Sequence, residues 1–493
     1  MVKAPLSSSA KCTLMGLAWL AAALRFPALF TNTFHADEAL FATWARLIAV
    51  WRDPLLLAQP VDKPPLLFYS QALFYPLFGP VAWAARLPAL FASLCLVPLT
   101  GLLAWRLYRS EVTAVLTSLV IALLPLSIQF SATAFIDPLL AALLAASLAL
   151  AAGSAWGPDR QVNRAGWSGF WLGLAVLTKH QAWLFLPLVV GVGALAGWRG
   201  RAWRHWLWGL APPLVLAALW SWLHSGGLTL WGVQLSNFGG IRPVWSWELW
   251  PRLQAWVHLW RLSLGSRMLA GLLAISLPLL IIRAWRKGDQ AAAWDLLFLT
   301  FIMGYSLLHW LLAIPIWDRY WLPLMPLAAL LVARTGTVVV DAGGRLPARM
   351  KAHSRAWAFA ALVVLLVLQW PSALRARAGG FPIGGQVSAD HGTAALSRAL
   401  ADAAYGTVLY DHWYSWQWRY HLFDKRVYVS WFPDPAALVR DVTAFGGDGS
   451  LRYVALPQSQ QSLPVLRMLR EAGFSLETAA VSSETTLYLI KVR

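Results

Sequence analysis

Long apolar runs separated by short polar segments form the main pattern of the chain. The runs are roughly 15 to 22 residues long, which is the length with which a helix crosses a bilayer. They predict about eleven membrane-spanning helices, with ends uncertain by a few residues. We expect them near 12–30, 84–107, 111–130, 137–155, 165–178, 181–198, 206–224, 264–283, 292–312, 319–335 and 356–370.

The composition agrees with a membrane-embedded chain. Hydrophobic residues make up 59% and charged residues 13%, whereas soluble domains carry about 25% charged residues. The net charge of +18 would suggest nucleic acid in a soluble protein, but here the basic residues lie between apolar runs. We therefore predict no nucleic-acid partner. Cys12 and Cys95 lie in apolar segments and do not form a disulfide framework.

Basic residues collect in every second loop, which predicts that these loops face the cytoplasm. They are Arg106, Arg109, Arg160, Arg164, Arg199, Arg201, Arg204, Arg283, Arg286, Lys287, Arg334, Arg345, Arg349, Lys351 and Arg355. The other loops, which include 31–79 and the Trp-rich 225–263, would then be extracytoplasmic. We expect an integral protein of the inner cell membrane, with its first span kept as an uncleaved anchor.

After Trp370 the chain becomes more charged and has no further run long enough to span a membrane. Two regions are therefore expected, 1–372 in the membrane and 373–493 outside it. The second region predicts a small α/β domain with strands at Thr407–Tyr410, Arg426–Val429 and Tyr453–Leu456. Helices are expected near 388–404, 434–445 and 460–472. An odd number of spans makes this domain extracytoplasmic. It carries no catalytic motif, so a lid, an acceptor-docking role and stabilisation all stay open.

The first outer loop, 31–79, is the richest in candidate chemistry. Asp37-Glu38 opens a segment whose apolar positions from Leu40 to Trp51 recur with the helical period. We expect an amphipathic helix on the outer membrane surface. Asp37 would be either a structural N-cap or a reactive group, and its acidic neighbour and membrane-proximal position favour reactivity.

A second charged motif, Asp62-Lys63-Pro64-Pro65, closes the same loop. The prolines restrict the backbone around Lys63, and a rigidly held lysine can bind a phosphate group as a point charge. The alternative is a lysine that only extends toward the membrane surface. Asp62 beside it favours the phosphate site, because an anchoring lysine needs no adjacent acid.

Several short motifs together resemble one superfamily. In chain order they are Asp37-Glu38-Ala39, Asp62-Lys63-Pro64-Pro65-Leu66, Ala85-Arg86-Leu87-Pro88, Phe135-Ile136-Asp137-Pro138, Leu177-Thr178-Lys179 and Arg319-Tyr320-Trp321-Leu322-Pro323. This order is similar to that of the protein O-mannosyltransferase and lipid A aminoarabinose transferase superfamily of GT-C-fold membrane glycosyltransferases. The resemblance spans roughly 30–335. Asp62 and His180 depart from it, because the family more often has Glu and Gly there.

The resemblance implies an inverting transfer of a sugar, hexosyl or pentosyl, from a polyprenyl phosphate to a lipid, glycan or protein acceptor. Asp37 would be the general base, Asp137 the second acid that helps to organise the site, and Lys63 would hold the donor phosphate. Glu38 or Asp137 would be the catalytic base if Asp37 is not. Further donor- or substrate-binding residues would be Asp62, Lys179, Arg319 and Tyr320.

Other interpretations of these residues stay open. Asp137 could cap a helix, Lys179 could end one, and Asp318-Arg319 could be an interfacial ion pair. The histidines lack metal-ligand spacing, although Asp37 or Asp62 could hold a divalent metal. The chain has no P-loop or dinucleotide fingerprint, which argues against a nucleotide-sugar donor. The alternative function is a transporter or flippase of a lipid-linked sugar, which would place charges near the middle of the membrane.

Overall fold

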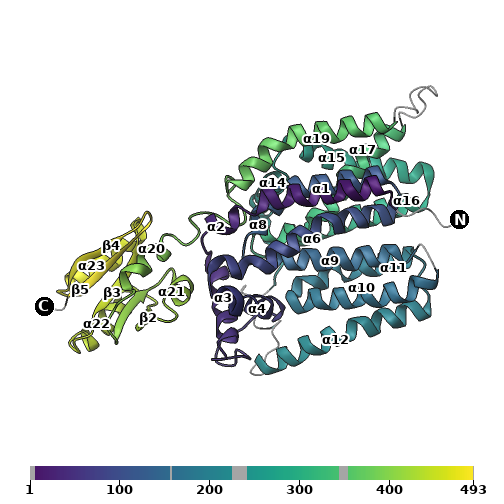
Figure 1. Cartoon of the computed structure of the whole chain (residues 1–493). Helices are drawn as coiled ribbons and strands as arrows, with labels where there is room; N and C mark the ends of the chain where they lie inside the picture. Colours follow the sequence, from purple (N-terminus) through teal and green to yellow (C-terminus); the bar gives the residue numbers. More distant parts are fainter. Residues whose placement is uncertain (1–5, 156–157, 225–231, 233–240, 343–353, 492–493) are drawn as a thin grey trace.

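The chain folds into a bundle of long helices and a smaller C-terminal domain that contains a β-sheet. The computed structural model describes residues 6–155, 158–224, 232, 241–342 and 354–491. Figure 1 shows the bundle helices running side by side, with the C-terminal domain beyond one end of them and the N terminus at the other end. The short helices α3 (Ala36–Ala49) and α4 (Leu66–Ala72) lie at the end that faces this domain.

The remaining helical segments of the bundle follow the apolar runs of the sequence. They are α1 (Ser8–Arg25), α2 (Ala28–Thr31), α5 (Tyr75–Phe78), α6 (Ala82–Tyr108), α7 (Glu111–Leu123), α8 (Pro125–Ser131), α9 (Asp137–Gly153), α10 (Pro158–Thr178), η1 (His180–Phe185), α11 (Leu186–Leu195), α12 (Gly200–His224), α14 (Ser246–Leu264), α15 (Arg267–Lys287), α16 (Gln290–Leu311), η2 (Asp318–Leu324), α17 (Met325–Ala342) and α19 (Ser354–Arg377). Every predicted span coincides with one of these segments or with a consecutive pair.

The predicted number of about eleven spans is not confirmed. Within the described residues, six helical segments are long and apolar enough to cross a membrane, or seven when the bent pair α7–α8 counts as one span. The other predicted spans fall on α9, α10, η1–α11 and α19. Of these, Asp137–Gly153 and His180–Leu195 are apolar but short for a crossing, whereas α10 and α19 have 21 and 24 residues, so length does not account for those two.

The predicted Trp-rich loop 225–263 is partly wrong. Residues 225–231 and 233–240 lie outside the described part of the chain, but 246–264 form the helix α14. Glu248 closes the first turn of α14 by accepting hydrogen bonds from the backbone N–H of Trp245 at 2.7 Å and from Arg242 at 2.8 Å. Trp260 of this helix then stacks on Trp321 of η2, and Trp256 packs against the same ring at a tilt. These two tryptophans are packing residues that position η2, whereas Trp245, Trp247 and Trp250 are exposed.

A 60° bend between α7 and α8 brings α8 toward the end of the bundle that carries α3. Pro125 begins α8, and the bend leaves carbonyl groups at the end of α7 without helical partners. Arg25, which is fully buried, donates to the carbonyl oxygens of Ile121 at 3.2 Å and Ala122 at 3.0 Å. It also donates to Ser127 of α8 at 3.0 Å. This arginine therefore fixes the direction in which α8 leaves the bend.

Helix α3 confirms the predicted helix at the start of the first outer loop, but its surroundings differ from the prediction. Phe41 and Trp44 are buried against Phe68 of α4, with ring centroids 5.6 and 4.9 Å from it. The apolar stripe of α3 therefore packs against protein rather than lying on a lipid surface. Periodicity reports that one face is buried and does not report what buries it.

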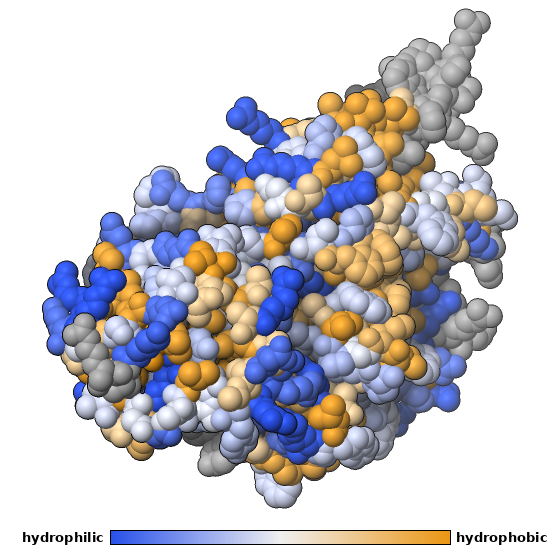
Figure 2. All heavy atoms as spheres, turned by 60° about the vertical axis from the view of Figure 1, so that its left-hand side comes forward, coloured by the Kyte–Doolittle hydropathy of each residue, from blue (hydrophilic) through white to orange (hydrophobic). Residues whose placement is uncertain are grey.

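The C-terminal domain contains a five-stranded sheet of order β2-β1-β3-β5-β4. Its strands are β1 (Thr407–Asp411), β2 (Val427–Trp431), β3 (Arg452–Pro457), β4 (Ser475–Val481) and β5 (Thr485–Lys491), and its helical segments are α20 (Thr393–Ser397), η4 (Arg398–Leu400), α21 (Ser415–His421), α22 (Pro435–Phe445), η5 (Gln460–Ser462) and α23 (Leu463–Glu471). The first three strands are parallel and β5 is antiparallel to both of its neighbours. Figure 2 shows hydrophilic residues interspersed with hydrophobic ones over the face that this domain presents.

The three predicted strands of this domain are present, but α21, β4 and β5 were not predicted. Strand β4 is largely exposed, so it lacks the apolar run that marks a buried strand. The helix expected near 388–404 is reduced to α20 and the turn η4, and the helix expected from 460 begins as the turn η5.

Helix α21 packs directly on α3. Arg46 of α3 forms an ion pair with Asp424 and lies over the ring of Phe423, 4.3 Å from its centroid. Tyr420 is buried against Phe34, with ring centroids 4.8 Å apart, and donates to the carbonyl of Pro80 at 2.8 Å. The C-terminal domain thus holds the helix on which Asp37 lies.

Candidate active site

A cavity of about 910 Å³ opens at the end of the bundle that faces the C-terminal domain. Five segments that are distant in sequence surround it: the start of α3, the turn at 62–63, the α8–α9 connection, the turn at 179–181 and residues 315–320. The segment 382–386, which follows α19, closes another side. The lining residues are His35, Asp37, Leu40, Phe41, Asp62, Lys63, Phe130, Phe135, Ile136, Asp137, Lys179, Gln181, Pro315, Trp317, Asp318, Arg319, Tyr320, Pro382, Ile383, Gly384 and Gln386.

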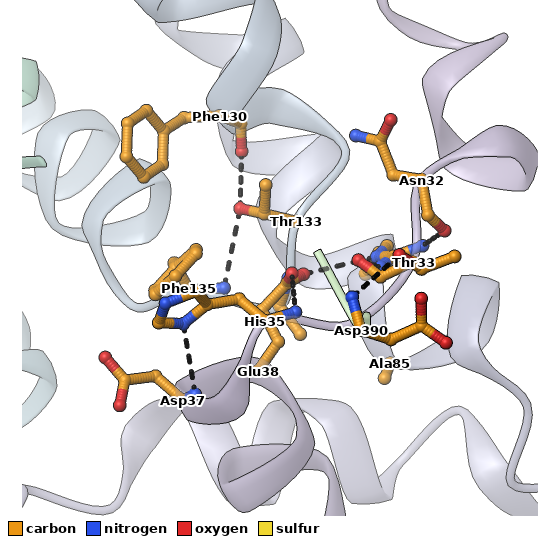
Figure 3. A network of polar contacts seen from close by, with 12 residues as sticks. Asn32, Thr33, His35, Asp37, Glu38, Ala85, Phe130, Thr133, Phe135 and Asp390 are labelled. Carbon is orange, nitrogen blue, oxygen red and sulfur yellow. Dashed lines mark hydrogen bonds and ion pairs between the residues drawn. The ribbon is translucent and has the colours of Figure 1, made fainter. Parts of the chain in front are cut away.

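The first turn of α3 separates its two acidic side chains. His35 is the N-cap, because its Nδ1 accepts a hydrogen bond from the backbone N–H of Asp37 at 3.2 Å. Glu38 completes the capping box by accepting from the backbone N–H of His35 at 3.0 Å. The alternative that Asp37 is the helix cap is therefore wrong. Figure 3 shows the two carboxylates pointing in different directions from the same turn.

Glu38 is completely buried and does not line the cavity. Its Oε1 accepts from the backbone N–H of Ala134 at 2.6 Å and from Arg86 of α6 at 3.2 Å. Arg86 in turn donates to the carbonyl oxygens of Asn32 at 2.7 Å and Thr33 at 2.8 Å. These contacts join α3 to α6 and to the connection before α9. The catalytic role of Glu38 stays a prediction, and these contacts favour a structural role for its carboxylate instead.

Asp37 faces the cavity and pairs with Arg319, with Oδ2 and Nη1 2.5 Å apart. Burial raises the pKa of this carboxyl, but the charge and hydrogen bond of Arg319 outweigh burial and leave the pKa below its usual value. The guanidinium of Arg319 lies 4.1 Å from the ring centroid of Trp317 and 5.3 Å from that of Phe135. Asp37 is therefore an ionised carboxylate beside a cation that aromatic rings hold in place.

Asp137 and Lys179 form a second buried pair, with Oδ1 and Nζ 2.6 Å apart. Asp137 is the first residue of α9, and its side chain makes no capping hydrogen bond there. Burial lowers the pKa of Lys179 to about 8, and Asp137 opposes that shift. The ammonium group also lies over the ring of Tyr320, 4.9 Å from the centroid. The alternatives that these two residues only begin or end helices do not explain this pairing.

Lys63 also lines the cavity and pairs with Asp62. The two prolines that follow precede α4, and the indole of Trp220 donates to the carbonyl oxygen of Lys63 at 3.1 Å. The backbone of this motif is therefore fixed from both sides. With Lys179 and Arg319, Lys63 is one of three cationic side chains that line the cavity.

The structure adds residues that the sequence did not single out. Asp318 accepts from the backbone N–H of Gly384 at 2.7 Å, and Gln129 donates to the carbonyl oxygen of Ile383 at 2.6 Å. These bonds place the segment 382–386 against the cavity. Its Pro-Ile-Gly-Gly-Gln sequence is uncharged, so only long-range contacts reveal it. Gln181 also lines the cavity, and its only signal was its position two residues after Lys179 in the same turn.

The residues do not fit a metal site. In the part of the chain that the structure describes, no group of three or more His, Cys, Asp or Glu side chains is placed to hold an ion. Asp37 and Asp62, the two carboxylates considered for this role, are each paired with a cation. We therefore assign no step to a metal.

Comparisons with known proteins point to one class. Residues 62–223 match the family described as dolichyl-phosphate-mannose-protein mannosyltransferase. No curated protein gives a match. Among solved structures, ArnT from Cupriavidus metallidurans bound to undecaprenyl phosphate has a TM-score of 0.65 at 17% identity, covering 96% of this chain and 97% of that one. An Archaeoglobus fulgidus oligosaccharyltransferase tethered to an acceptor peptide has a TM-score of 0.59 at 13% identity, covering 97% of this chain and 74% of that one.

These comparisons confirm the resemblance predicted from the ordered motifs. The chain has the fold of the GT-C membrane glycosyltransferases. Together with the long apolar helices, this fold defines an integral membrane protein.

Proposed function

We propose that this protein transfers a sugar from a polyprenyl phosphate to an acceptor hydroxyl, with Asp37 as the general base. The observation that carries the proposal is the convergence of three cations, Lys63, Lys179 and Arg319, with the carboxylate of Asp37 on a single cavity at the end of the bundle. The fold supports it, because a structural neighbour with this architecture was solved with undecaprenyl phosphate bound. The sugar would be hexosyl or pentosyl, and the acceptor a lipid, a glycan or a protein.

The reaction is a single displacement at the anomeric carbon. The acceptor oxygen forms the new bond to this carbon as its proton passes to Asp37, and the bond to the phosphate oxygen breaks with its electron pair. A base so placed contributes typically about 10²–10⁴-fold in rate. Lys63 and Arg319 neutralise the charge that develops on the leaving phosphate. Attack on the face opposite to the phosphate inverts the configuration of that carbon.

Donor binding would also adjust the base. In the free protein Arg319 forms an ion pair with Asp37 and keeps its pKa low. A donor phosphate that also binds the guanidinium of Arg319 weakens the ion pair between Arg319 and Asp37. Burial then raises the pKa of Asp37 with less opposition from Arg319. The carboxylate therefore becomes a better proton acceptor when the donor is in place.

We propose that the cavity faces the extracytoplasmic side. Helix α6 begins near the cavity and ends at Tyr108, directly before the basic residue Arg109. Helix α12 also connects the two ends of the bundle. Its His224 contacts the carbonyl of Leu55 in the first loop at 2.8 Å, and its first residue, Gly200, follows a cluster of basic loop residues. The positive-inside rule places those residues in the cytoplasm.

Cysteine labelling tests this orientation in a variant whose Cys12 and Cys95 are replaced by serine. A membrane-impermeant maleimide added to intact spheroplasts should label a cysteine at Ser388, which is exposed just after the segment that closes the cavity. It should not label one at Gly200. Labelling at Gly200 in sealed cells would place the cavity in the cytoplasm.

Transfer itself is tested with purified protein and a panel of radiolabelled undecaprenyl-phosphate sugars. A transferase consumes the donor and releases undecaprenyl phosphate when an envelope-lipid, glycan or peptide acceptor fraction is present. A transporter or flippase would instead move the intact lipid-linked sugar across the bilayer of proteoliposomes. Translocation without cleavage of the sugar–phosphate bond would overturn the proposal.

A further inference from the structure

Two buried acceptor oxygens in the cavity wall receive no hydrogen bond from the residues that the structure describes. One is Oε1 of Gln181 and the other is Oδ2 of Asp137. Both residues line the cavity. Buried polar atoms nearly always have partners, so two such acceptors in one wall are expected to meet hydrogen-bond donors from a ligand.

The amide of Gln181 is held in a defined orientation. Its nitrogen is hydrogen-bonded to the hydroxyl of Tyr305 and donates to the carbonyl oxygen of Tyr320 at 3.2 Å. The hydroxyl of Tyr305 itself donates to that carbonyl at 3.0 Å, so its lone pairs accept from the amide. Because acceptors fix the nitrogen, Oε1 is the atom of this amide that has no described partner.

The two carboxylate oxygens of Asp137 also differ, because only one of them has a described partner. Its Oδ1 accepts from the ammonium group of Lys179 at 2.6 Å, and Oδ2 is the atom without a described donor. The adjacent ammonium group repels a metal cation at this position. The cavity lining therefore contains two buried acceptors without described donors, which suit a neutral or donor-bearing group. They do not suit a phosphate, whose oxygens are themselves acceptors.

We infer that Asp137 and Gln181 form the subsite for the transferred sugar and accept hydrogen bonds from its hydroxyl groups. This inference rests on the proposed function and deepens it. It divides the cavity into a phosphate side, with Lys63 and Arg319, and a sugar side, with Asp137 and Gln181. The sugar must carry free O–H or N–H groups toward this wall. A donor that is acylated or deoxygenated at those positions leaves buried acceptors unpaired and is rejected.

The experiment compares two probes on one variant. Gln181→Met keeps the length of the side chain but removes the acceptor, together with the amide N–H groups that bond Tyr305 and Tyr320. The probes are bare undecaprenyl phosphate and the undecaprenyl-phosphate sugar that the wild type turns over in the panel described above. We expect the Kd for bare undecaprenyl phosphate to stay within about twofold, while KM for the sugar-bearing donor rises about tenfold, the effect of one lost hydrogen bond to a ligand.

Tyr305→Phe is the matched control. It removes one partner of the amide nitrogen and leaves both Oε1 and the bond to the carbonyl of Tyr320, so both constants should change by no more than about threefold. Deoxy analogues of the donor sugar give a second measurement. Removing the sugar hydroxyl that binds Gln181 should raise KM of the wild type about tenfold. It should leave KM of Gln181→Met nearly unchanged, because the deoxy sugar and the substitution remove the same hydrogen bond.

The outcomes separate this inference from the proposed function. If the wild type binds undecaprenyl phosphate and transfers sugar, but Gln181→Met behaves like the wild type toward every donor, the subsite is refuted alone. Equal loss of affinity for the bare lipid phosphate and the full donor would also refute it, since the residue would then act on the phosphate side or on folding. A wild type that neither binds undecaprenyl phosphate nor transfers sugar would overturn the proposed function, and this inference with it.

Discussion

The buried pair of Glu38 and Arg86 offers the clearest separation of a structural acid from a reactive one. Their side chains are 0% and 1% exposed, and the Oε1–Nε distance is 3.2 Å. Removing one partner of such a pair leaves an uncompensated buried charge, which costs about 3–5 kcal/mol. We expect Glu38→Ala to lower the free energy of unfolding by an amount near the top of that range, because the backbone N–H groups of His35 and Ala134 also lose their acceptor.

Two further variants test how much of this loss of unfolding free energy comes from the buried charge. Glu38→Gln keeps one oxygen for the backbone N–H of Ala134 but removes the charge, so we expect a loss of about 3 kcal/mol. The double variant Glu38→Met, Arg86→Met removes both charges. Its destabilisation should be smaller than the sum of the single effects by about 1–3 kcal/mol, the usual coupling of residues in contact.

The assay is reversible unfolding of the purified protein in mixed detergent micelles, followed by tryptophan fluorescence, with sugar transfer measured on the folded fraction. The folded Glu38→Gln protein should retain most of its transfer rate, since this carboxylate does not line the cavity. A variant as stable as the wild type but without transfer would refute the structural assignment and return Glu38 to the chemistry.

Three further predictions concern charge and docking. Arg319→Gln leaves burial to raise the pKa of Asp37, so the fall in kcat/KM on acidification should begin at a higher pH than in the wild type; an unmoved acidic limb would contradict the pairing. Lys63→Ala should weaken binding of undecaprenyl phosphate by at least about tenfold, and Lys63→Arg should restore it only in part, as measured by tryptophan quenching; unchanged affinity would make Lys63 a surface lysine. Tyr420→Ala should lower the free energy of unfolding by about 3–5 kcal/mol, because this ring is buried between the domains. Asp424→Asn should lower it by less than about 1 kcal/mol in the same assay, because the Asp424 side chain of that ion pair is exposed.

Much of the site could be predicted because membrane topology restricts where loops can meet. Loops that alternate along the chain face the same side, so the motifs around Asp37, Lys63, Asp137, Lys179 and Arg319 were expected together. The structure does place all of them around one cavity. Their chemical roles stay predictions.

The sequence could not choose between the adjacent acids of α3. Neighbouring residues of a helix point about 100° apart, so only one of the two faces the cavity. The choice depends on the cap, and here the cap is His35, a residue outside the usual set of Ser, Thr, Asp and Asn. A capping box with Glu38 follows from that cap and leaves Asp37 to the cavity.

A long-range contact explains why the segment 382–386 was missed, and exposure explains why β4 was missed. The segment 382–386 reaches the cavity through Gln129, more than 250 positions earlier in the chain, and no local pattern signals such a contact. Strands β4 and β5 pair with one another as a hairpin at the edge of the sheet. The exposed positions of β4 conceal its strand character, because an edge strand needs little apolar surface of its own.

The central claim is that Asp37 removes the proton from the acceptor, and the variant Asp37→Asn tests it most directly. Sugar transfer, binding of undecaprenyl phosphate and the unfolding curve are measured on the same purified protein. Transfer should fall by about 10²-fold or more, while the lipid phosphate still binds, because Lys63 is unchanged. Folding should be little affected, since His35 caps the helix. Near-normal transfer with an unchanged unfolding curve would contradict the assignment of Asp37 as the base.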